Sequence, residues 1–318
     1  MSQVDWLSQL VQMITIAGQL EVRCTYGAPW RVAWAQSAAQ EIPFHVVLKG
    51  RAVIEDTEAG TTRELVGGDI VLLTGGSAHV LHDGSGHASG PTYNRRGSAG
   101  FTLSENEGGG ALLDMLCGRF FIGRPHDRLI REYIPTNLVV RAVPGYGEEG
   151  RVSASSNLAN LVALMREESA DERPGGYAIL NALSSALFTL AMRAASESEQ
   201  VPAGLLALAG HPRLAPAISG MFTNPERSWN LVDLADLCGM SRATFMRHFQ
   251  DKLGRSAKEL LTDIRMSRAA NELKKPAMTT EAVADLVGYR SVAAFRRAFT
   301  DKMGMTPGQW RRLASKAE

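Results

Sequence analysis

Two stretches near the C-terminus of this 318-residue sequence repeat one pattern. They read GMSRATFMRHFQDKLG (residues 239–254) and GYRSVAAFRRAFTDKMG (residues 288–304). Five positions around the first stretch recur 49 or 50 residues later, namely Ala235, Gly239, Phe245, Phe249 and Gly254. Five matches in one register predict two copies of the same small helical unit.

Each copy predicts two helices joined by a tight turn. In the first copy Asn230 and Asp233 form a capping-box pattern, Gly239 ends the helix, and Ser241 caps the next one. Phe245 and Phe249, four residues apart, then point inward. That leaves a small residue and an arginine on the outer face of the second helix. The pattern is typical of a helix-turn-helix. We expect one over residues 231–251 and another over residues 280–301.

A single helix is predicted between the copies, over SAKELLTDIRMSRAANELKK (residues 256–275). Ser256 and Glu259 form a second capping box, and Pro276 stops the helix. Twenty residues at about 1.5 Å each span roughly 30 Å. Successive major grooves on one face of B-DNA recur about every 34 Å. Such a helix would hold two DNA-reading helices in adjacent grooves.

The chain from about residue 204 to the end resembles the DNA-binding domain of the AraC/XylS family of bacterial transcription regulators. The resemblance lies in the two copies, the linking helix and the closing GMTPGQWRR (residues 304–312). It implies sequence-specific binding to promoter double-stranded DNA, with activation through RNA polymerase as the family tendency. The DNA-binding residues that it implies are Arg242, Ala243, Met246, Arg247, Arg290, Val292, Ala293, Arg296 and Arg297.

The distribution of charge agrees with a nucleic-acid partner at one end. From Pro225 onward there are 17 Lys and Arg against 11 Asp and Glu, while the remainder has 17 against 22. Lys252, Arg290 and Lys302 suit phosphate contacts, which position a protein without specifying sequence. The alternative for each of these cations is a solvated surface charge.

The N-terminal part has the alternation and turns of an antiparallel sandwich or barrel. The segment GDIVLLTGGSAHVLHD (residues 68–83) resembles the second motif of cupin barrels, with His79 at the inward histidine position. Ser37, Ala39 and Pro43 stand where the first motif would supply metal ligands. We therefore expect no metal, no cofactor and no catalytic residue. The alternatives are a metal-dependent cupin enzyme with a DNA-binding tail, and a DNA-binding structural protein with a vestigial barrel.

A sensor pocket is expected from the same strands. His45 lies two residues beyond Pro43, so both face one way. If they face inward, His45, His79 and Trp34 line a pocket for a small-molecule effector. The alternative is a pair of structural histidines inside the barrel. Residues 83–110 are rich in Gly and Ser and predict a long loop without chemistry.

Three cysteines without a CxxC pair indicate a reducing compartment, and the N-terminus lacks the basic region of a signal peptide. With no apolar run of about 18 residues, a cytoplasmic protein is expected. The whole chain resembles AraC-type regulators with an N-terminal cupin, some of which respond to oxidants. That resemblance makes Cys24 and Cys117 redox candidates. The alternative is two buried hydrophobic side chains; Cys238 is expected to be structural.

The fold class expected is α+β multidomain: a cupin-like β-barrel, then helices, then an all-α domain with two helix-turn-helix motifs. The domains are a sensor over residues 1–150, a helical region over 151–203 and the DNA-binding domain over 204–318. The helix after Pro174 is apolar around much of its girth. It either packs on a second copy, which makes a homodimer, or is a single core helix.

Overall fold

The structure is a computed structural model that describes residues 5–97, 100–143, 153–171 and 173–315. The chain forms two compact units. The sheet unit comprises residues 16–122 and 135–200, and the helical unit comprises residues 1–15, 123–134 and 201–318. The boundary expected at residue 150 lies outside the described residues.

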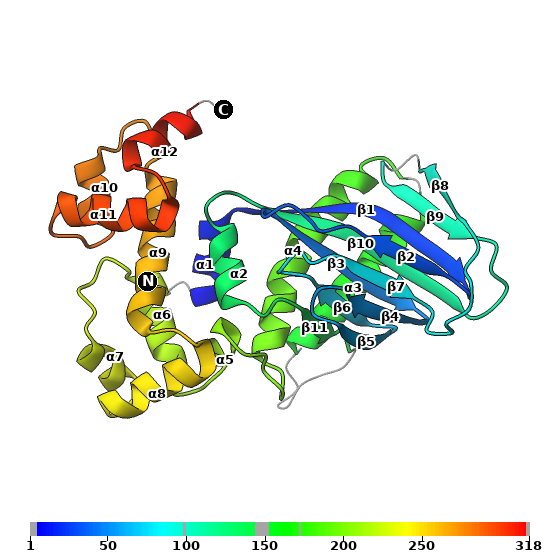
Figure 1. The fold of residues 1–318 in the computed structure, drawn as a ribbon, viewed down its shortest axis with the longest axis horizontal. Coiled ribbons are helices and arrows are strands. Elements are labelled where there is room, and N and C mark those ends of the chain that lie inside the picture. Colours follow the sequence, from blue (N-terminus) through cyan, green and yellow to red (C-terminus); the bar gives the residue numbers. More distant parts are fainter. Residues whose placement is uncertain (1–4, 98–99, 144–152, 172, 316–318) are drawn as a thin grey trace. The chain divides into compact units, whose positions relative to one another are not determined.

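The sheet unit contains two β-sheets, drawn in Figure 1. The larger sheet has the order β11-β6-β3-β10-β1-β9-β8 and the smaller one β2-β7-β4-β5. Their strands are β1 (Ile16–Gly27), β2 (Arg31–Trp34), β3 (Glu41–Lys49), β4 (Arg51–Asp56), β5 (Thr61–Val66), β6 (Asp69–Leu72), β7 (His79–His82), β8 (Thr92–Arg96), β9 (Thr102–Asn106), β10 (Leu112–Ile122) and β11 (Leu138–Arg141).

The cupin-like β-barrel expected from the sequence is not closed. Among the described residues no strand of one sheet pairs with a strand of the other. β8 extends the edge of the larger sheet, and because its side chains are mostly exposed it offers no apolar face for closure. The buried core between the sheets draws on both of them, with Cys24, Val47 and Met115 from the larger and Ile54 and Leu81 from the smaller.

The loop expected over residues 83–110 is wrong in part, since it contains β8 and β9. These strands pair with each other antiparallel, and β9 pairs with β1 in parallel. Backbone hydrogen bonds along the edge of an existing sheet stabilise a segment whose side chains are too polar to predict a strand.

Two helices, α3 (Ala154–Ala170) and α4 (Gly176–Ser196), pack together, and α4 covers the outer face of the larger sheet. The backbone N–H of Gly18 donates to Ser185 Oγ at 2.8 Å. A Cβ at Gly18 would lie 2.5 Å from the α4 backbone, so only glycine permits this approach. By length and composition α4 could cross a membrane, but its apolar residues Leu187 and Phe188 are buried within the sheet unit.

The helical unit is built around one long helix, α9. Figure 1 shows the pair α7–α8 at one end of α9 and the pair α10–α11 at the other. Its helices are α1 (Trp6–Ile14), α2 (Asp127–Tyr133), α5 (Leu205–Ala209), α6 (Ala215–Thr223), α7 (Leu231–Leu237), α8 (Arg242–Leu253), α9 (Ala257–Glu272), α10 (Thr280–Leu286), α11 (Val292–Met303) and α12 (Pro307–Ala314).

The linking helix is shorter than expected. α9 has 16 residues, or about 24 Å at 1.5 Å per residue. Leu273 caps it, and the turn that follows uses the last residues before Pro276. The capping boxes at Asn230 and Ser256 are present with both of their hydrogen bonds.

The two helical pairs are built alike. Gly239 and Gly288 follow the ends of α7 and α10 with φ of +58° and +80°, a region that glycine enters without steric cost. Two phenylalanines then anchor each second helix in the core: Phe245 and Phe249 in α8, at most 1% exposed, and their repeats in α11, fully buried. The sequence repeat thus corresponds to a structural repeat.

Two segments from the first half of the chain belong to the helical unit. The side chain of Asn271, on α9, donates to the Met13 carbonyl of α1 at 2.7 Å. Its Oδ1 accepts from His126 Nε2 at the start of α2 at 2.8 Å. Trp6 of α1 also packs against Phe222 of α6, with ring centroids 6.2 Å apart. The sequence placed both segments in the sensor region.

His126 gives the helical unit a predicted pH dependence. Burial lowers the pKa of His126 from 6.5 to about 4. Between these values the unfolded chain binds a proton that the folded chain excludes, so stability falls as the pH drops below 6.5. At about 1.36 kcal/mol per pH unit, we expect a loss of about 2 kcal/mol between pH 7.5 and pH 5.

Urea unfolding of the full chain at the two pH values measures this loss. His126→Gln is the control because it keeps an N–H donor but does not titrate. The pH-dependent loss should be smaller in this variant by about 2 kcal/mol. An equal loss in both proteins would show that His126 is not its source.

Candidate nucleic-acid interface and sensor pocket

The outer face of α8 carries the expected DNA-binding residues of the first pair. Arg242, Ala243, Met246 and Arg247 are all exposed, and Met246 keeps 55% of its surface accessible. An exposed methionine beside two arginines offers apolar contact and paired N–H donors on one helix face. Thymine methyl groups and guanine edges are recognised by such groups.

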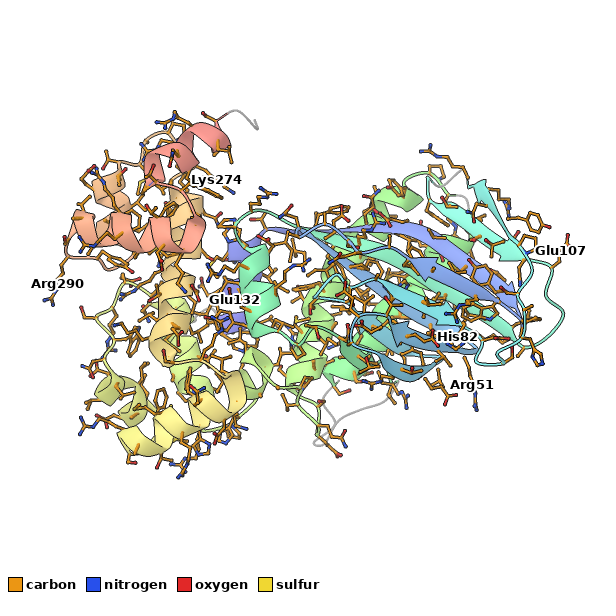
Figure 2. All side chains as sticks on the ribbon, viewed as in Figure 1. Arg51, His82, Glu107, Glu132, Lys274 and Arg290 are labelled. Carbon is orange, nitrogen blue, oxygen red and sulfur yellow. The ribbon has the colours of Figure 1, made fainter. Side chains whose placement is uncertain are left out.

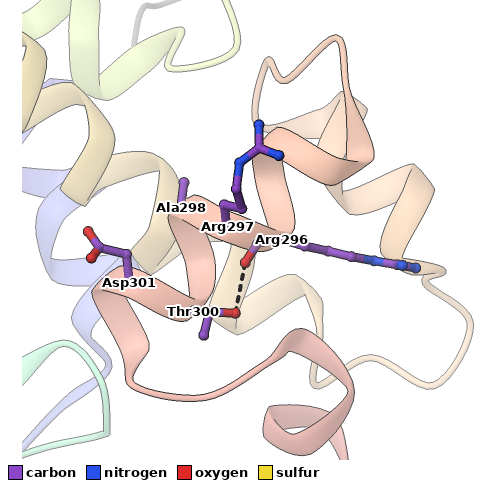
Figure 3. A pocket seen from close by; sticks show the side chains of 5 residues that line it. All are labelled: Arg296, Arg297, Ala298, Thr300 and Asp301. Atoms are coloured by element: carbon purple, nitrogen blue, oxygen red, sulfur yellow. Dashed lines mark hydrogen bonds between the residues drawn. The ribbon is translucent and has the colours of Figure 1, made fainter.

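The outer face of α11 repeats this arrangement. Ala293, Arg296 and Arg297 are exposed, and Val292 is half-buried. Figure 3 shows that the side chains of Arg296 and Arg297 leave the helix in different directions around a shallow hollow. Arg296 forms an exposed ion pair with Glu281 of α10 at 3.3 Å. Exposed pairs of this kind contribute little stability, so Arg296 can exchange its partner.

The three cations expected at phosphates differ in their surroundings. Arg290, in the turn before α11, is exposed and points away from the ribbon in Figure 2. Lys252 is half-buried. Lys302 is instead paired with the buried Asp263 at 2.6 Å and is only 16% exposed. The phosphate role expected for Lys302 is therefore wrong, because its ammonium group is already neutralised inside the helical unit.

In the sheet unit the structure brings the three sensor-pocket residues together. The ring of Trp34 lies 5.2 Å from that of His45 and stacks on that of His79 at 6.1 Å, measured between centroids. They line a cavity of about 100 Å³ together with further residues, namely Ala35, Gln36, Ser37, Glu41, Pro43, Gly118 and Arg119. Since a water molecule occupies about 30 Å³, this space admits about three.

Glu41 and Arg119 were not found from the sequence. Arg119 lies opposite Pro43 in the β10–β3 pairing, and Cys117 lies opposite His45. That register joins segments more than seventy residues apart, and no local pattern encodes it. The only available signal was the alternation of each strand, which gives the faces but not the partners.

The polar contacts behind the pocket fix the tautomers of both histidines. His79 Nδ1 lies 3.0 Å from the Ser77 carbonyl, which can only accept, so this nitrogen carries a proton. Burial lowers the pKa of both imidazoles, so each is neutral and His79 Nε2 is an acceptor. His45 Nε2, 2.8 Å away, must then donate to it.

The chain of hydrogen bonds continues to a thiol. With His45 Nε2 protonated, its Nδ1 is free to accept, and it lies 3.0 Å from Cys117 Sγ. Cys117 therefore donates to His45. Burial raises the pKa of the Cys117 thiol, which keeps the proton on sulfur at neutral pH. Cys24 Sγ lies 3.9 Å from Cys117 Sγ, and both thiols are buried and free.

A metal site needs several metal-ligating residue types around one ion. Among the described residues no group of three or more His, Cys, Asp or Glu is placed to hold one ion. Cys238, which caps the end of α7, is buried.

Comparison with known proteins covers both parts of the chain. Residues 5–197 match a family model described as Cupin. Residues 234–313 match one described as a helix-turn-helix domain.

Curated relatives align along nearly the full length. An uncharacterized HTH-type transcriptional regulator of Haemophilus influenzae is 26% identical over 98% of this chain and all of its own. The RCS-specific HTH-type transcriptional activator RclR of Escherichia coli is 27% identical over 97% of each chain. The HTH-type transcriptional regulator MtrA of Neisseria gonorrhoeae is 28% identical over 97% of this chain and 98% of its own.

The chain belongs to the AraC/XylS family of transcription regulators and carries an N-terminal cupin domain. As an AraC/XylS regulator it binds DNA through its helix-turn-helix domain. The matched region of that domain begins within α7 and ends within α12, so it contains α8, α9, α10 and α11 in full.

Proposed function

We propose that this regulator reads two neighbouring major grooves of promoter DNA with α8 and α11, each the second helix of a helix-turn-helix motif. One observation carries the proposal. α8 and α11 follow equivalent glycine turns, bury equivalent phenylalanine pairs and expose Arg247 and Arg297 on their outer faces. Two copies double the number of base pairs that one chain reads.

The two helices are expected to read DNA in different ways. Arg297 and Arg247 each suit a bidentate contact to guanine O6 and N7. Ala243 and Met246 lack hydrogen-bonding groups and suit thymine methyls and groove shape. Arg290 suits a phosphate.

Capture of genomic fragments by the full chain, followed by sequencing, tests this function. We expect the enriched fragments to share two short sequence blocks whose centres lie about 10–10.5 base pairs apart. Enrichment without a shared sequence would instead favour a DNA-binding structural protein. The same proposal has three further parts. They are a domain division at residues 150 and 203, a cytoplasmic location, and activation through RNA polymerase.

For the signal, we propose an oxidant that acts at Cys24 and Cys117. The pocket beside His45 holds about 100 Å³, whereas pockets for drug-sized ligands hold about 300–1,000 Å³. A molecule of a few atoms, such as hypochlorous acid, fits this space, and an aromatic inducer does not. The two sulfur atoms, 3.9 Å apart, need to approach by about 2 Å to reach a disulfide bond length.

The proposed oxidation of the two thiols conserves atoms and electrons. Two thiols lose two protons and two electrons and form one S–S bond. One molecule of hypochlorous acid accepts the two electrons, and its O–Cl bond breaks. Its oxygen leaves as water after taking up one thiol proton, and chloride leaves with the other proton. His45 Nδ1 is placed to receive the Cys117 proton during this step.

Mild hypochlorite should change promoter occupancy by the wild-type protein and should not change it in Cys24→Ser or Cys117→Ser. Cys238→Ser is the control, because Cys238 lies in the helical unit and should respond like wild type. Mass spectrometry of the oxidised protein should find the Cys24–Cys117 peptide pair. An unchanged response in Cys24→Ser would remove Cys24 as the sensor.

We also propose that the chain forms a homodimer through the outer face of α3 and α4. Leu164 and Ile179 are exposed there, at 46% and 42% of their surface, beside the half-buried Leu161, Leu183 and Leu190. Exposed apolar side chains gathered on one helix pair suit a second copy. Sedimentation should give a dimer for wild type and a monomer for the double variant Leu164→Lys/Ile179→Lys. A wild-type monomer at micromolar concentration would contradict the proposal.

A further inference from the structure

A buried carboxylate joins three helices of the helical unit. Asp263, on α9, keeps only 7% of its side chain exposed. Its Oδ2 accepts a hydrogen bond from the Tyr133 hydroxyl of α2 at 2.5 Å. Its Oδ1 pairs with Lys302 Nζ, in the last turn of α11, at 2.6 Å. We call Tyr133, Asp263 and Lys302 the Asp263 cluster.

Further contacts hold α2 against this cluster. Glu132 of α2 pairs with Arg255, just before α9, at 2.9 Å. The Arg255 guanidinium lies 5.5 Å from the centre of the Tyr133 ring. Arg128 of α2 donates to the Lys302 carbonyl at 2.9 Å. Helix α2 therefore contacts Asp263, which is the partner of the Lys302 side chain, and also the backbone of the last turn of α11.

Loss of either partner of the buried Asp263 carboxylate is costly, so the cluster holds both partners in place. A buried carboxylate must be paired and hydrogen-bonded to offset its desolvation, and removal of one partner leaves an uncompensated charge. Asp263 therefore ties the last turn of α11 to α9 through Lys302, and it ties α2 to α9 through Tyr133. A shift of the last turn of α11 would break the ion pair.

The first helical pair differs from the second in its ion pairing, although the Lys252 carbonyl accepts a backbone hydrogen bond from Gly204 at 2.8 Å. Lys252 in α8 occupies the position that Lys302 occupies in α11, fifty residues later. Among the described residues Lys252 forms no ion pair, whereas Lys302 is committed to Asp263. This difference between Lys252 and Lys302 means that the buried ion pair acts on α11 and not on α8.

We infer that Asp263 and Lys302 are positioning residues for DNA recognition by α11, and that α2 completes their arrangement through Tyr133. This inference rests on the proposed function, in which α11 reads bases. It makes α2, a segment more than one hundred residues earlier in the chain, part of the DNA-reading unit.

The test uses the full chain and two DNA fragments. One is a fragment selected by the wild-type protein, and the other has the sequence block read by α11 scrambled. The ratio of the affinities for these two fragments measures how much sequence discrimination α11 provides. Lys302→Met and Asp263→Asn should lower this ratio by about tenfold, with little change in affinity for the scrambled fragment. Lys302→Arg should restore most of it, and Tyr133→Phe should give a partial loss.

Lys252→Met is the matched comparison: Lys252 suits a phosphate, so its loss should weaken binding to both fragments alike and leave the ratio unchanged. Two results would overturn the inference: Lys302→Met behaving like Lys252→Met, or equal losses on both fragments, which indicate a merely structural role. If Asp263→Asn does not fold, judged by circular dichroism, the pair Lys302→Met and Lys302→Arg decides alone. A wild-type ratio near one would instead count against base reading by α11, which is a failure of the proposed function.

Discussion

Replacing Gly288 with alanine should destabilise the helical unit far more than the same change at Gly239. The two glycines hold equivalent turns, and both have positive φ, which costs an alanine about 1–2 kcal/mol. A Cβ at Gly239 meets nothing within 4 Å. A Cβ at Gly288 would lie 2.3 Å from the Glu226 carbonyl oxygen, a backbone atom that cannot rotate away.

The difference between the two variants isolates that steric conflict. Overpacking of this kind typically costs about 1–3 kcal/mol, so Gly288→Ala should lose that much more stability than Gly239→Ala. Urea unfolding of both variants measures it. The loop that carries Glu226 is itself held by Arg265, which donates to the Pro225 carbonyl at 2.6 Å, and cannot easily retreat. Equal losses in the two variants would show that this loop yields.

The second large effect concerns DNA. Arg297→Ala and Arg247→Ala should each reduce discrimination between the selected sequence and random DNA by about 1–3 kcal/mol. Because the two arginines lie on different helices without shared partners, the double variant should lose roughly the sum. Competition binding at fixed salt measures each loss.

Arg290→Ala provides the contrast for these variants. Its side chain lies in the turn and suits a phosphate, so its loss should weaken binding to all sequences alike and reduce the salt slope by about one. Discrimination should stay unchanged. If Arg290→Ala alters sequence preference while Arg297→Ala does not, the roles assigned to the two residues are reversed.

Local signals in the sequence predicted much of the helical unit. Capping at Asn230 and Ser256, the turn glycines and the buried phenylalanines depend on neighbours within four residues, so they can be read without a fold. The repeat then predicts the same turn and the same buried phenylalanine pair in the second copy. The partner of Lys302 could not be predicted, because Asp263 lies on another helix and only packing brings the two together.

The sheet unit was harder to predict because its contacts are long-range. Alternation put His45 on the same face as Pro43, and the cupin resemblance gave His79 its inward position, but the 3.0 Å contact between His45 and Cys117 follows from strand pairing. The same pairing decides between an open sandwich and a closed barrel. α1 and α2 are short helices with few buried residues, and no pattern within them indicates that they pack in the helical unit.

Guanine methylation interference on a selected fragment tests reading by two helices within one chain. Two interference sites are expected in the major groove, on one face of the duplex and about 10–10.5 base pairs apart. Arg247→Ala should abolish one site and Arg297→Ala the other. A single site, or loss of the same site in both variants, would contradict reading by two helices.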